Sequence, residues 1–190
     1  DDERIALEGL LDVISEAAPG AELNGFEYPE DALEFLDDNV CNIAFLDVDD
    51  RFEFRALETL WCLREQTDAD TVGCAHTNLL PDGTATIEPL LPAGVYEKEG
   101  IREGIVYPLL GDRLRQPVFN GFIWRYLFSA RILKNANITF EGAYLEDELF
   151  LMEYFCNAHK LAVTEEPLYR YLLNLNSATH KYMKDFHKVF

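Results

Sequence analysis

Four apolar residues at positions 43–46 end abruptly in three carboxylates, Asp47, Asp49 and Asp50. A short, continuous apolar run is typical of a strand that is buried on both faces of a parallel sheet. Because residues i and i+2 of a strand project to the same side, we expect Asp47 and Asp49 to converge and Asp50 to point elsewhere. In open α/β sheets, ligands bind beyond the carboxyl ends of the strands, so the acidic segment 47–50 is a candidate site.

Apolar spacing around this run predicts an α/β fold, because helices and strands alternate through the first 80 residues. We expect a Rossmann-like parallel or mixed sheet flanked by helices, with a less regular, helical C-terminal portion. The predicted helices cover residues 4–18, 29–36, 57–63, 97–105, 145–158 and 178–190, with one or two helical turns within 124–133. The predicted strands cover residues 21–26, 43–46, 71–76, 161–164 and 168–173, and a turn at 81–83 leads to a hairpin arm at 84–87.

Charge limits the class of partner. The 190 residues carry 35 acids and 16 bases, a net charge of −19. This acidity excludes nucleic acid as a partner, because phosphate binding needs a basic face. It also argues against docking on anionic lipid, which needs a polybasic patch. The charge is uneven, since residues 1–50 hold sixteen of the acids and a single base, Arg4.

The four cysteines show neither a CxxC pair nor zinc-ligand spacing, so the sequence predicts no disulfide framework and no zinc site. We interpret them as reduced core thiols of a cytoplasmic protein. No signal peptide is visible, and the apolar stretch at 118–133 is too short and too charged to span a bilayer. The chain starts without Met and ends within a pattern, which suggests a fragment.

Two acidic pairs have the chemistry of a catalytic site. Converging Asp47 and Asp49 would suit Mg²⁺ or Mn²⁺, which prefer oxygen ligands, although a solvated acidic turn is the alternative. Glu146 and Asp147 fall near the start of the helix at 145–158, where the helix dipole favours an ionised carboxylate. An ionised Asp in a cleft can take a proton from a hydroxyl nucleophile, and ordinary first-turn charge is the alternative.

From about residue 43 to 190, five short motifs appear in the order typical of glycosyltransferase family 2, which the chain resembles. The resemblance implies a GT-A-like fold and inverting transfer of a sugar from a nucleotide-sugar to a glycan or other acceptor hydroxyl. We expect no transmembrane segment, and the resemblance is compatible with peripheral association at the inner face of the membrane. The sequence does not indicate an oligomeric state. The motifs are the strand end with its acidic segment at 45–50, the helix and strand at 56–74, and the segments 118–140, 144–150 and 166–179.

The same resemblance assigns roles to individual residues. Asp49 would hold Mn²⁺ or Mg²⁺ on the donor diphosphate, supported by Asp47, which would also contact the nucleotide. Asp147 would be the general base, with Glu146 beside it at the acceptor site. The C-terminal motif would bring Ser177 and Thr179 near the diphosphate; Leu172 stands where a basic residue is usual, and Arg170 is displaced from that position.

The front of the chain departs from this family, because its nucleotide-binding strand, turn and helix are missing. Residues 1–50 instead resemble the first half of a response-regulator receiver domain. In that interpretation Asp1 and Asp2 bind Mg²⁺ and Asp47 accepts a phosphoryl group. We expect a receiver-like part at 1–50 and a glycosyltransferase-like part at 43–190, packed as one unit. A phospho-accepting receiver module and an inactive chimeric fragment are the alternative hypotheses for function.

Overall fold

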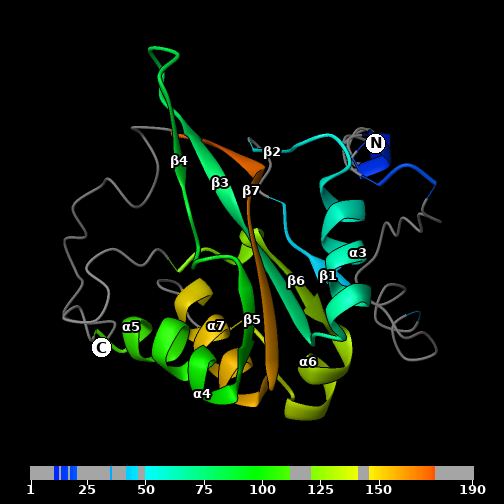
Figure 1. The fold of residues 1–190 in the computed structure, drawn as a ribbon, viewed down its shortest axis with the longest axis vertical. Helices are drawn as coiled ribbons and strands as arrows, with labels where there is room; N and C mark the ends of the chain where they lie inside the picture. Colours follow the sequence, from blue (N-terminus) through cyan, green and yellow to red (C-terminus); the bar gives the residue numbers. More distant parts are fainter. Residues whose placement is uncertain are drawn as a thin grey trace.

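In the computed structural model, a seven-stranded mixed sheet forms the centre of the molecule, with helices on both faces (Figure 1). The structure describes residues 11, 12, 14–16, 18–20, 35, 42–46, 50–111, 121–140 and 146–173. The strand order is β1-β6-β3-β7-β2, with β4 paired to β3 and β5 paired to β7. The predicted α/β class, with a mixed sheet flanked by helices, is confirmed.

The central pair is β3 (Thr71–Leu79) and β7 (Lys160–Leu172), which run parallel along nine paired positions. The other strands all pair antiparallel to these two or to β6. They are β1 (Asn42–Ala44), β2 (Arg51–Phe52), β4 (Ala85–Glu88), β5 (Gly94–Glu97) and β6 (Tyr126–Ser129).

Each face of the sheet has its own apolar core. On one face, α3 (Ala56–Thr67) packs Ala56 and Leu60 against side chains of β3, β6 and β7. On the opposite face lie α4 (Lys98–Ile101), the π-helical turn η1 (Arg102–Val106), α5 (Tyr107–Leu109) and α7 (Glu146–Asn157) (Figure 1). A 3-10 turn, η2 (Ile123–Arg125), leads into β6, and α6 (Ala130–Ala136) follows it.

Gly73 allows the second core to close on β3. A Cβ at this position would overlap the side chain of Leu90, and Tyr126 would lie about 3.1 Å away. Both side chains are buried in the core that contains α7. The absence of a side chain at Gly73 therefore lets the chain after β4 pack directly on the central strand.

Three of the predicted elements differ from the structure in pairing, continuity or extent. Residues 43–46 were expected in a buried parallel strand, but β1 is antiparallel to β6 and only half-buried. The expected helical turns within 124–133 are interrupted by β6, a four-residue strand that is buried throughout. The two C-terminal strands are one strand, β7, whose pairing with β3 shifts register near Cys74 and Ala75.

The helices at 56–67 and 146–157, the helical segment at 98–109 and the β3–β4 hairpin agree with the sequence patterns. The predicted elements at 21–26 and 178–190 lie outside the described residues. The described part of the 4–18 segment is helical at residues 11, 12 and 14–16. It contacts the rest of the chain through Glu16, whose carbonyl accepts a 3.1 Å hydrogen bond from the Arg55 N–H.

The hydroxyl of Tyr154 connects α7 to the sheet. Its oxygen lies 2.6 Å from Thr71 Oγ1 and accepts a hydrogen bond from the Ser129 N–H at 2.9 Å. Burial raises the pKa of Tyr154 to about 12, so this group stays protonated at neutral pH.

We predict that Tyr154→Phe lowers the free energy of unfolding by about 1–2 kcal/mol, because it leaves buried polar groups on β3 and β6 without their partner. Urea denaturation of the wild type and the variant measures this loss. Tyr96→Phe is the matched control, since the Tyr96 hydroxyl bonds the Pro92 carbonyl at an exposed position. Equal losses in both variants would contradict the prediction.

Candidate functional site

Asp50, the last residue of the acidic segment 47–50, is buried and bonded to β7. Asp50 is only 6% exposed to solvent. Oδ2 accepts a hydrogen bond from the Tyr169 hydroxyl at 3.0 Å, and Oδ1 accepts one from the Leu172 N–H at 2.9 Å. Both oxygens of this carboxylate therefore satisfy protein donors, which offsets the cost of burying its charge.

An aromatic stack lies directly behind Tyr169. The Trp124 ring packs on the Tyr169 ring with centroids 4.2 Å apart and planes 9° apart. Phe122 stacks on Trp124 at 4.7 Å, and Tyr171 lies nearly parallel to Trp124 at 5.5 Å. Such geometry adds about 0.5–1.5 kcal/mol per pair beyond the area buried. The stack fixes η2 against the C-terminal end of β7.

The first turn of α7 packs against Gly121, the residue that precedes Phe122 of the aromatic stack. A Cβ on Gly121 would overlap Glu148 Cγ, so the absence of a side chain at Gly121 lets α7 approach closely. Glu146, Asp147 and Glu148 form the acidic first turn of α7, and all three are half-buried. The positive end of the α7 dipole lies at this first turn and stabilises the negative charge of these carboxylates.

A continuous series of contacts thus joins the two acidic motifs. Asp50 bonds to Tyr169, Tyr169 stacks on Trp124, and Trp124 stacks on Phe122. Phe122 follows Gly121, which packs against the first turn of α7. A carboxylate in the first turn of a helix, where the dipole favours its ionised form, can accept a proton from a bound hydroxyl.

His76 is a buried base at the edge of the stack. Its ring meets Trp124 edge-on at 4.8 Å, and Nε2 lies 3.1 Å from Asn78 Oδ1. Burial, and then the nearby Arg125 guanidinium, lower the pKa of His76 to about 4. Nδ1 has no hydrogen-bond partner among the described residues. His76 is therefore neutral at pH 7.

Arg125 is a buried cation beside His76. Its Nε donates to the Cys74 carbonyl and its Nη2 donates to the Glu88 carbonyl, both at 3.3 Å. Burial lowers the pKa of Arg125. The guanidinium joins β3, β4 and η2 where the register of β3 with β7 shifts.

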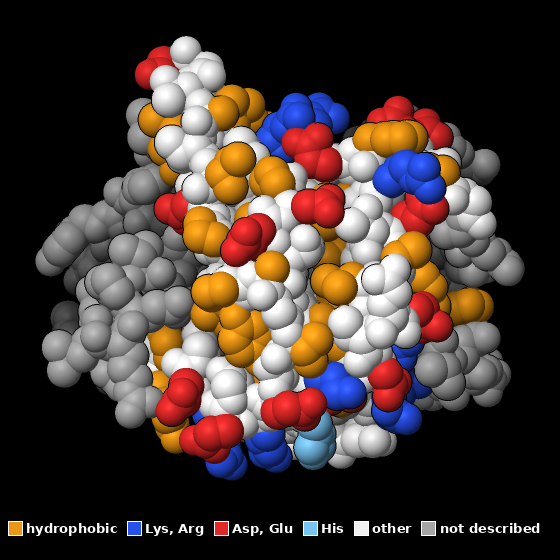
Figure 2. Space-filling view, viewed as in Figure 1, with side chains coloured by type: hydrophobic (Ala, Val, Ile, Leu, Met, Phe, Trp, Pro, Cys, Tyr) orange, Lys and Arg blue, Asp and Glu red, His pale blue; other side chains and the backbone are white. Residues whose placement is uncertain are grey.

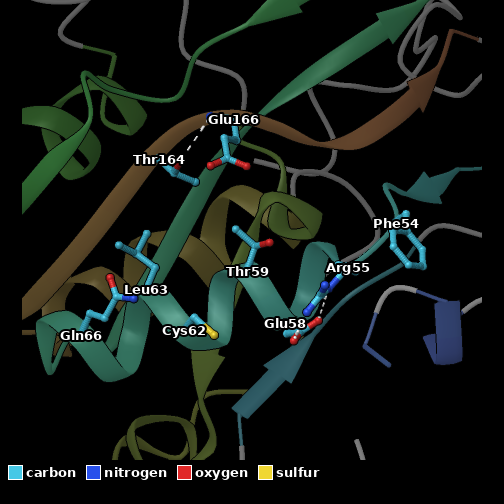
Figure 3. Close-up of a pocket in the computed structure, with 9 residues that line it drawn as sticks. All are labelled: Phe54, Arg55, Glu58, Thr59, Cys62, Leu63, Gln66, Thr164 and Glu166. Atoms are coloured by element: carbon cyan, nitrogen blue, oxygen red, sulfur yellow. Dashed lines mark hydrogen bonds and ion pairs between the residues drawn. The ribbon is translucent and has the colours of Figure 1, made fainter. Parts of the chain in front are cut away.

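A groove of about 580 Å³ lies elsewhere, between α3 and β7 (Figure 3). Arg55 and Glu58 form an ion pair at one end, with Nε 2.5 Å from Oε2. None of Glu146, Asp147 and Arg170 lines this groove. Its lining residues are Phe54, Arg55, Glu58, Thr59, Cys62, Leu63, Gln66, Thr164 and Glu166.

Of the residues predicted to form a site, Glu146, Asp147 and Arg170 are described, whereas Asp1, Asp2, Asp47, Asp49, Ser177 and Thr179 lie outside the described residues. Arg170 Nη2 pairs with Glu53 Oε1 at 2.6 Å, in an exposed position. Within the described ranges, no three His, Cys, Asp or Glu side chains cluster in a way that could hold a metal ion.

The prediction that all the cysteines are core thiols is wrong for two of them. Cys62 and Cys156 are exposed, whereas Cys74 is buried, which raises its thiol pKa to about 12. Cys41 lies outside the described residues. Both exposed thiols lie on helices, Cys62 on α3 and Cys156 on α7. The presence of one apolar residue in a helix does not determine whether that residue lies on the buried face.

Sequence reasoning placed Asp50 in the candidate segment without predicting its bonds to β7, and it gave no role to Gly121, Trp124 or Tyr169. All four residues lie inside or beside the motifs that carry the family resemblance, and this position in the motifs is the sequence signal that could have identified them. On the face shown in Figure 2, acidic and basic side chains are interspersed, with no continuous basic surface among the side chains coloured by type. No helix in the described ranges is both long and apolar enough to span a membrane.

Comparison with known proteins gives one curated relative and several solved structures, whereas no family model matches. The chain is 29% identical over 140 residues to an uncharacterised glycosyltransferase, EpsJ, of Bacillus subtilis (strain 168), covering 72% of the chain and 39% of EpsJ.

The fold is similar to that of S. aureus TarS. The structure of TarS residues 1–349 in complex with UDP-GlcNAc superposes with a TM-score of 0.58 at 18% identity, over 81% of this chain and 42% of the TarS 1–349 chain. The complex with UDP gives 0.53 at 17% identity, over 74% and 38%. These findings confirm the predicted resemblance to glycosyltransferases with a GT-A-like fold. The chain spans about two fifths of the length of these relatives, and the receiver-like resemblance of residues 1–50 stays a prediction.

We predict that acid destabilises the fold through His76. The unfolded chain binds a proton on this side chain near pH 6.5 and the folded chain near pH 4, so stability is lost as the pH falls through this interval. The loss reaches up to about 3 kcal/mol at pH 4. Urea denaturation at pH 7, 6, 5 and 4 should therefore give a flatter profile for His76→Phe than for the wild type.

His159→Gln is the control for this profile, because His159 is exposed. Its pH profile should follow the wild type. Parallel profiles for the wild type and His76→Phe would show that His76 is not the group that titrates.

Proposed function

We propose that the chain forms the metal-side and acceptor-side part of a glycosyltransferase active site. The reaction is transfer of a sugar from a nucleotide-sugar to an acceptor hydroxyl, with inversion at the anomeric carbon. The observation that carries this proposal is the series of contacts from Asp50 through Tyr169 and Trp124 to the first turn of α7. This series supports the proposal because it links Asp50, which ends the segment 47–50, to the first turn of α7.

In this reaction Asp147 acts as the general base. Its carboxylate takes the proton of the acceptor hydroxyl while the acceptor oxygen attacks the anomeric carbon. The bond from that carbon to the diphosphate oxygen breaks, and its electron pair leaves with the diphosphate. The position of Asp147 in the first turn of α7 supports this role, because the helix dipole favours the ionised carboxylate.

Asp47 and Asp49 are the residues that would hold Mn²⁺ or Mg²⁺. The resemblance of this segment to the metal-binding motif of the family supports this choice, and the neighbouring Asp50 has another role, since both of its oxygens accept hydrogen bonds from β7. A bound divalent cation would offset the charge that develops on the leaving diphosphate.

The donor is proposed to be a UDP-sugar, because the TarS structures with the matching fold contain UDP-GlcNAc and UDP. Glu146 would contact the acceptor beside Asp147. Arg170, Ser177 and Thr179 are proposed on the diphosphate side; contact from Arg170 requires release of its ion pair with Glu53.

We predict that Asp147→Asn lowers Mn²⁺-dependent sugar transfer or hydrolysis about 10²- to 10⁴-fold, because the amide cannot take the acceptor proton. Release of UDP from a panel of UDP-sugars, with and without hydroxyl acceptors, measures the rate. UDP binding by calorimetry should not change, since Asp147 acts on the acceptor.

Glu153→Gln is the matched control, because Glu153 is an exposed carboxylate farther along the same helix. It should keep the wild-type rate. Full activity in Asp147→Asn would exclude it as the base, and a wild-type chain that binds no nucleotide-sugar from the panel would overturn the proposed function.

A further inference from the structure

The groove between α3 and β7 is lined by none of the described residues that the proposed reaction uses. It has a volume of about 580 Å³, and nine residues line it (Figure 3). Ligand sites usually measure about 300–1,000 Å³, so the groove is large enough for a ligand. Two of its lining side chains, Phe54 and Leu63, are hydrocarbons, and a ligand that also fits the remaining side chains must be polar.

One wall of the groove is a single face of α3, on which the lining side chains recur every three or four residues. They are Arg55 at the N-cap, Glu58, Thr59, Cys62, Leu63 and Gln66. Because a helix rises about 1.5 Å per residue, the row from Arg55 to Gln66 is roughly 16 Å long. A row of this length suits a ligand made of several linked units.

The opposite wall is the irregular part of β7. Between the positions where Thr164 and Pro167 pair with β3, the strand carries two extra residues, Glu165 and Glu166. A bulge of this kind re-aims side chains. In Figure 3 the Glu166 carboxylate extends from β7 toward α3, and the Glu166 N–H donates to Thr164 Oγ1 at 3.2 Å. The bulge therefore presents a hydroxyl and a carboxylate to the groove.

Several polar groups of the lining have hydrogen-bonding capacity that the fold does not use. The side chains of Thr59, Gln66 and Glu166 make no hydrogen bond within the described part of the chain. Thr164 Oγ1 accepts one bond and can still donate its own proton. Together these groups can both donate to and accept from the hydroxyls of a ligand.

The charges of the groove disfavour an anion. Among the described residues that line it, Arg55 is the one base, and Glu58 holds its guanidinium through two hydrogen bonds of 2.5 Å. The Glu166 carboxylate has no ion pair within the described ranges. A phosphate in the groove would therefore meet a negative charge and no free cation.

Phe54 adds an aromatic surface at the end of the groove that adjoins β2. Its side chain is exposed, at 71%. The face of an aromatic ring carries negative charge density, which attracts the C–H groups on the face of a sugar ring. An exposed ring beside free hydroxyl, amide and carboxylate groups thus matches a molecule with C–H groups on its faces and hydroxyls on its edges.

We propose that the groove between α3 and β7 binds a neutral oligosaccharide. Phe54 stacks on one sugar ring, and Thr59, Gln66, Thr164 and Glu166 bond the hydroxyls. The binding needs neither metal nor nucleotide, so it does not depend on the proposed function. Within that function, the role of the groove is to retain a glycan acceptor on the protein.

Two exposed thiols make the proposal testable in the full chain. Cys62 lines the groove, whereas Cys156 lies on α7 and outside it. Peptide mass spectrometry follows the alkylation of both thiols by iodoacetamide, with and without maltotetraose, cellotetraose or tetra-N-acetylchitotetraose. We expect at least one of these sugars, at a concentration several times its dissociation constant, to slow the alkylation of Cys62 about fivefold and to leave Cys156 unchanged.

The variant that tests the aromatic surface is Phe54→Ala, which should remove the protection of Cys62, whereas Phe54→Tyr should keep it. Trp61→Ala is the matched control, because Trp61 is also an exposed aromatic residue of this region but lies outside the groove. Protection is the ratio of the rates with and without sugar for each variant, so a change in the intrinsic reactivity of Cys62 cancels. Circular dichroism checks that each variant is folded.

Three results would overturn the proposal: no protection of Cys62 by any of the three sugars, equal protection of Cys156, or unchanged protection in Phe54→Ala. Hexalysine is tested in parallel, and protection of Cys62 by this peptide alone would show that the groove takes a basic peptide instead. Because no UDP-sugar is present, a wild type without transferase activity would overturn the proposed function and leave the alkylation result decisive for the groove.

Discussion

Parallel pairing of β3 with β7 is the interaction on which the rest of the structure depends. Each other strand reaches the sheet through one of these two strands or through β6, which itself pairs with β3. The cores on both faces are built on side chains from this pair. The C-terminal end of β7 carries Tyr169 and Leu172, which bond Asp50. The C-terminal end of β7 therefore also holds the buried carboxylate of Asp50.

The irregular part of that pairing explains why the aromatic stack lies where it does. The register shifts around Ala75, where β7 contributes extra residues between its paired positions. Bulges of this kind re-aim side chains and break the regular ladder. The Cys74 carbonyl there accepts a hydrogen bond from Arg125, and His76 pairs in register with Tyr169. A bend in the ladder and a buried cation thus support the surface on which Trp124 packs.

Sequence patterns predicted the parts of the fold in which spacing and burial agree. The helix at α7 has apolar residues at helical spacing, and the β3–β4 hairpin has a turn signal at its tip. Sequence patterns failed where packing in the folded chain determined the secondary structure. The strand β6 follows η2 without a turn signal between them. Pro167 interrupts the apolar pattern of β7, although the strand continues through it. For the site, motif order singled out both acidic pairs as candidates, but the bond of Tyr169 to Asp50 joins residues 119 positions apart along the chain.

The acidic residues show why a charge count could not identify the site. Asp70 Oδ2 accepts hydrogen bonds from the His159 and Lys160 N–H groups, and Asp50 accepts two from β7. A carboxylate that already satisfies buried or backbone donors is a poor base and a poor ligand, because either role would leave those donors unpaired. Asp147 differs in place, since it lies in the half-buried first turn of α7, where the helix dipole favours an ionised carboxylate. The same residue type therefore accepts hydrogen bonds from the ends of strands in two positions and meets a helix dipole in a third, and a charge count cannot separate these environments.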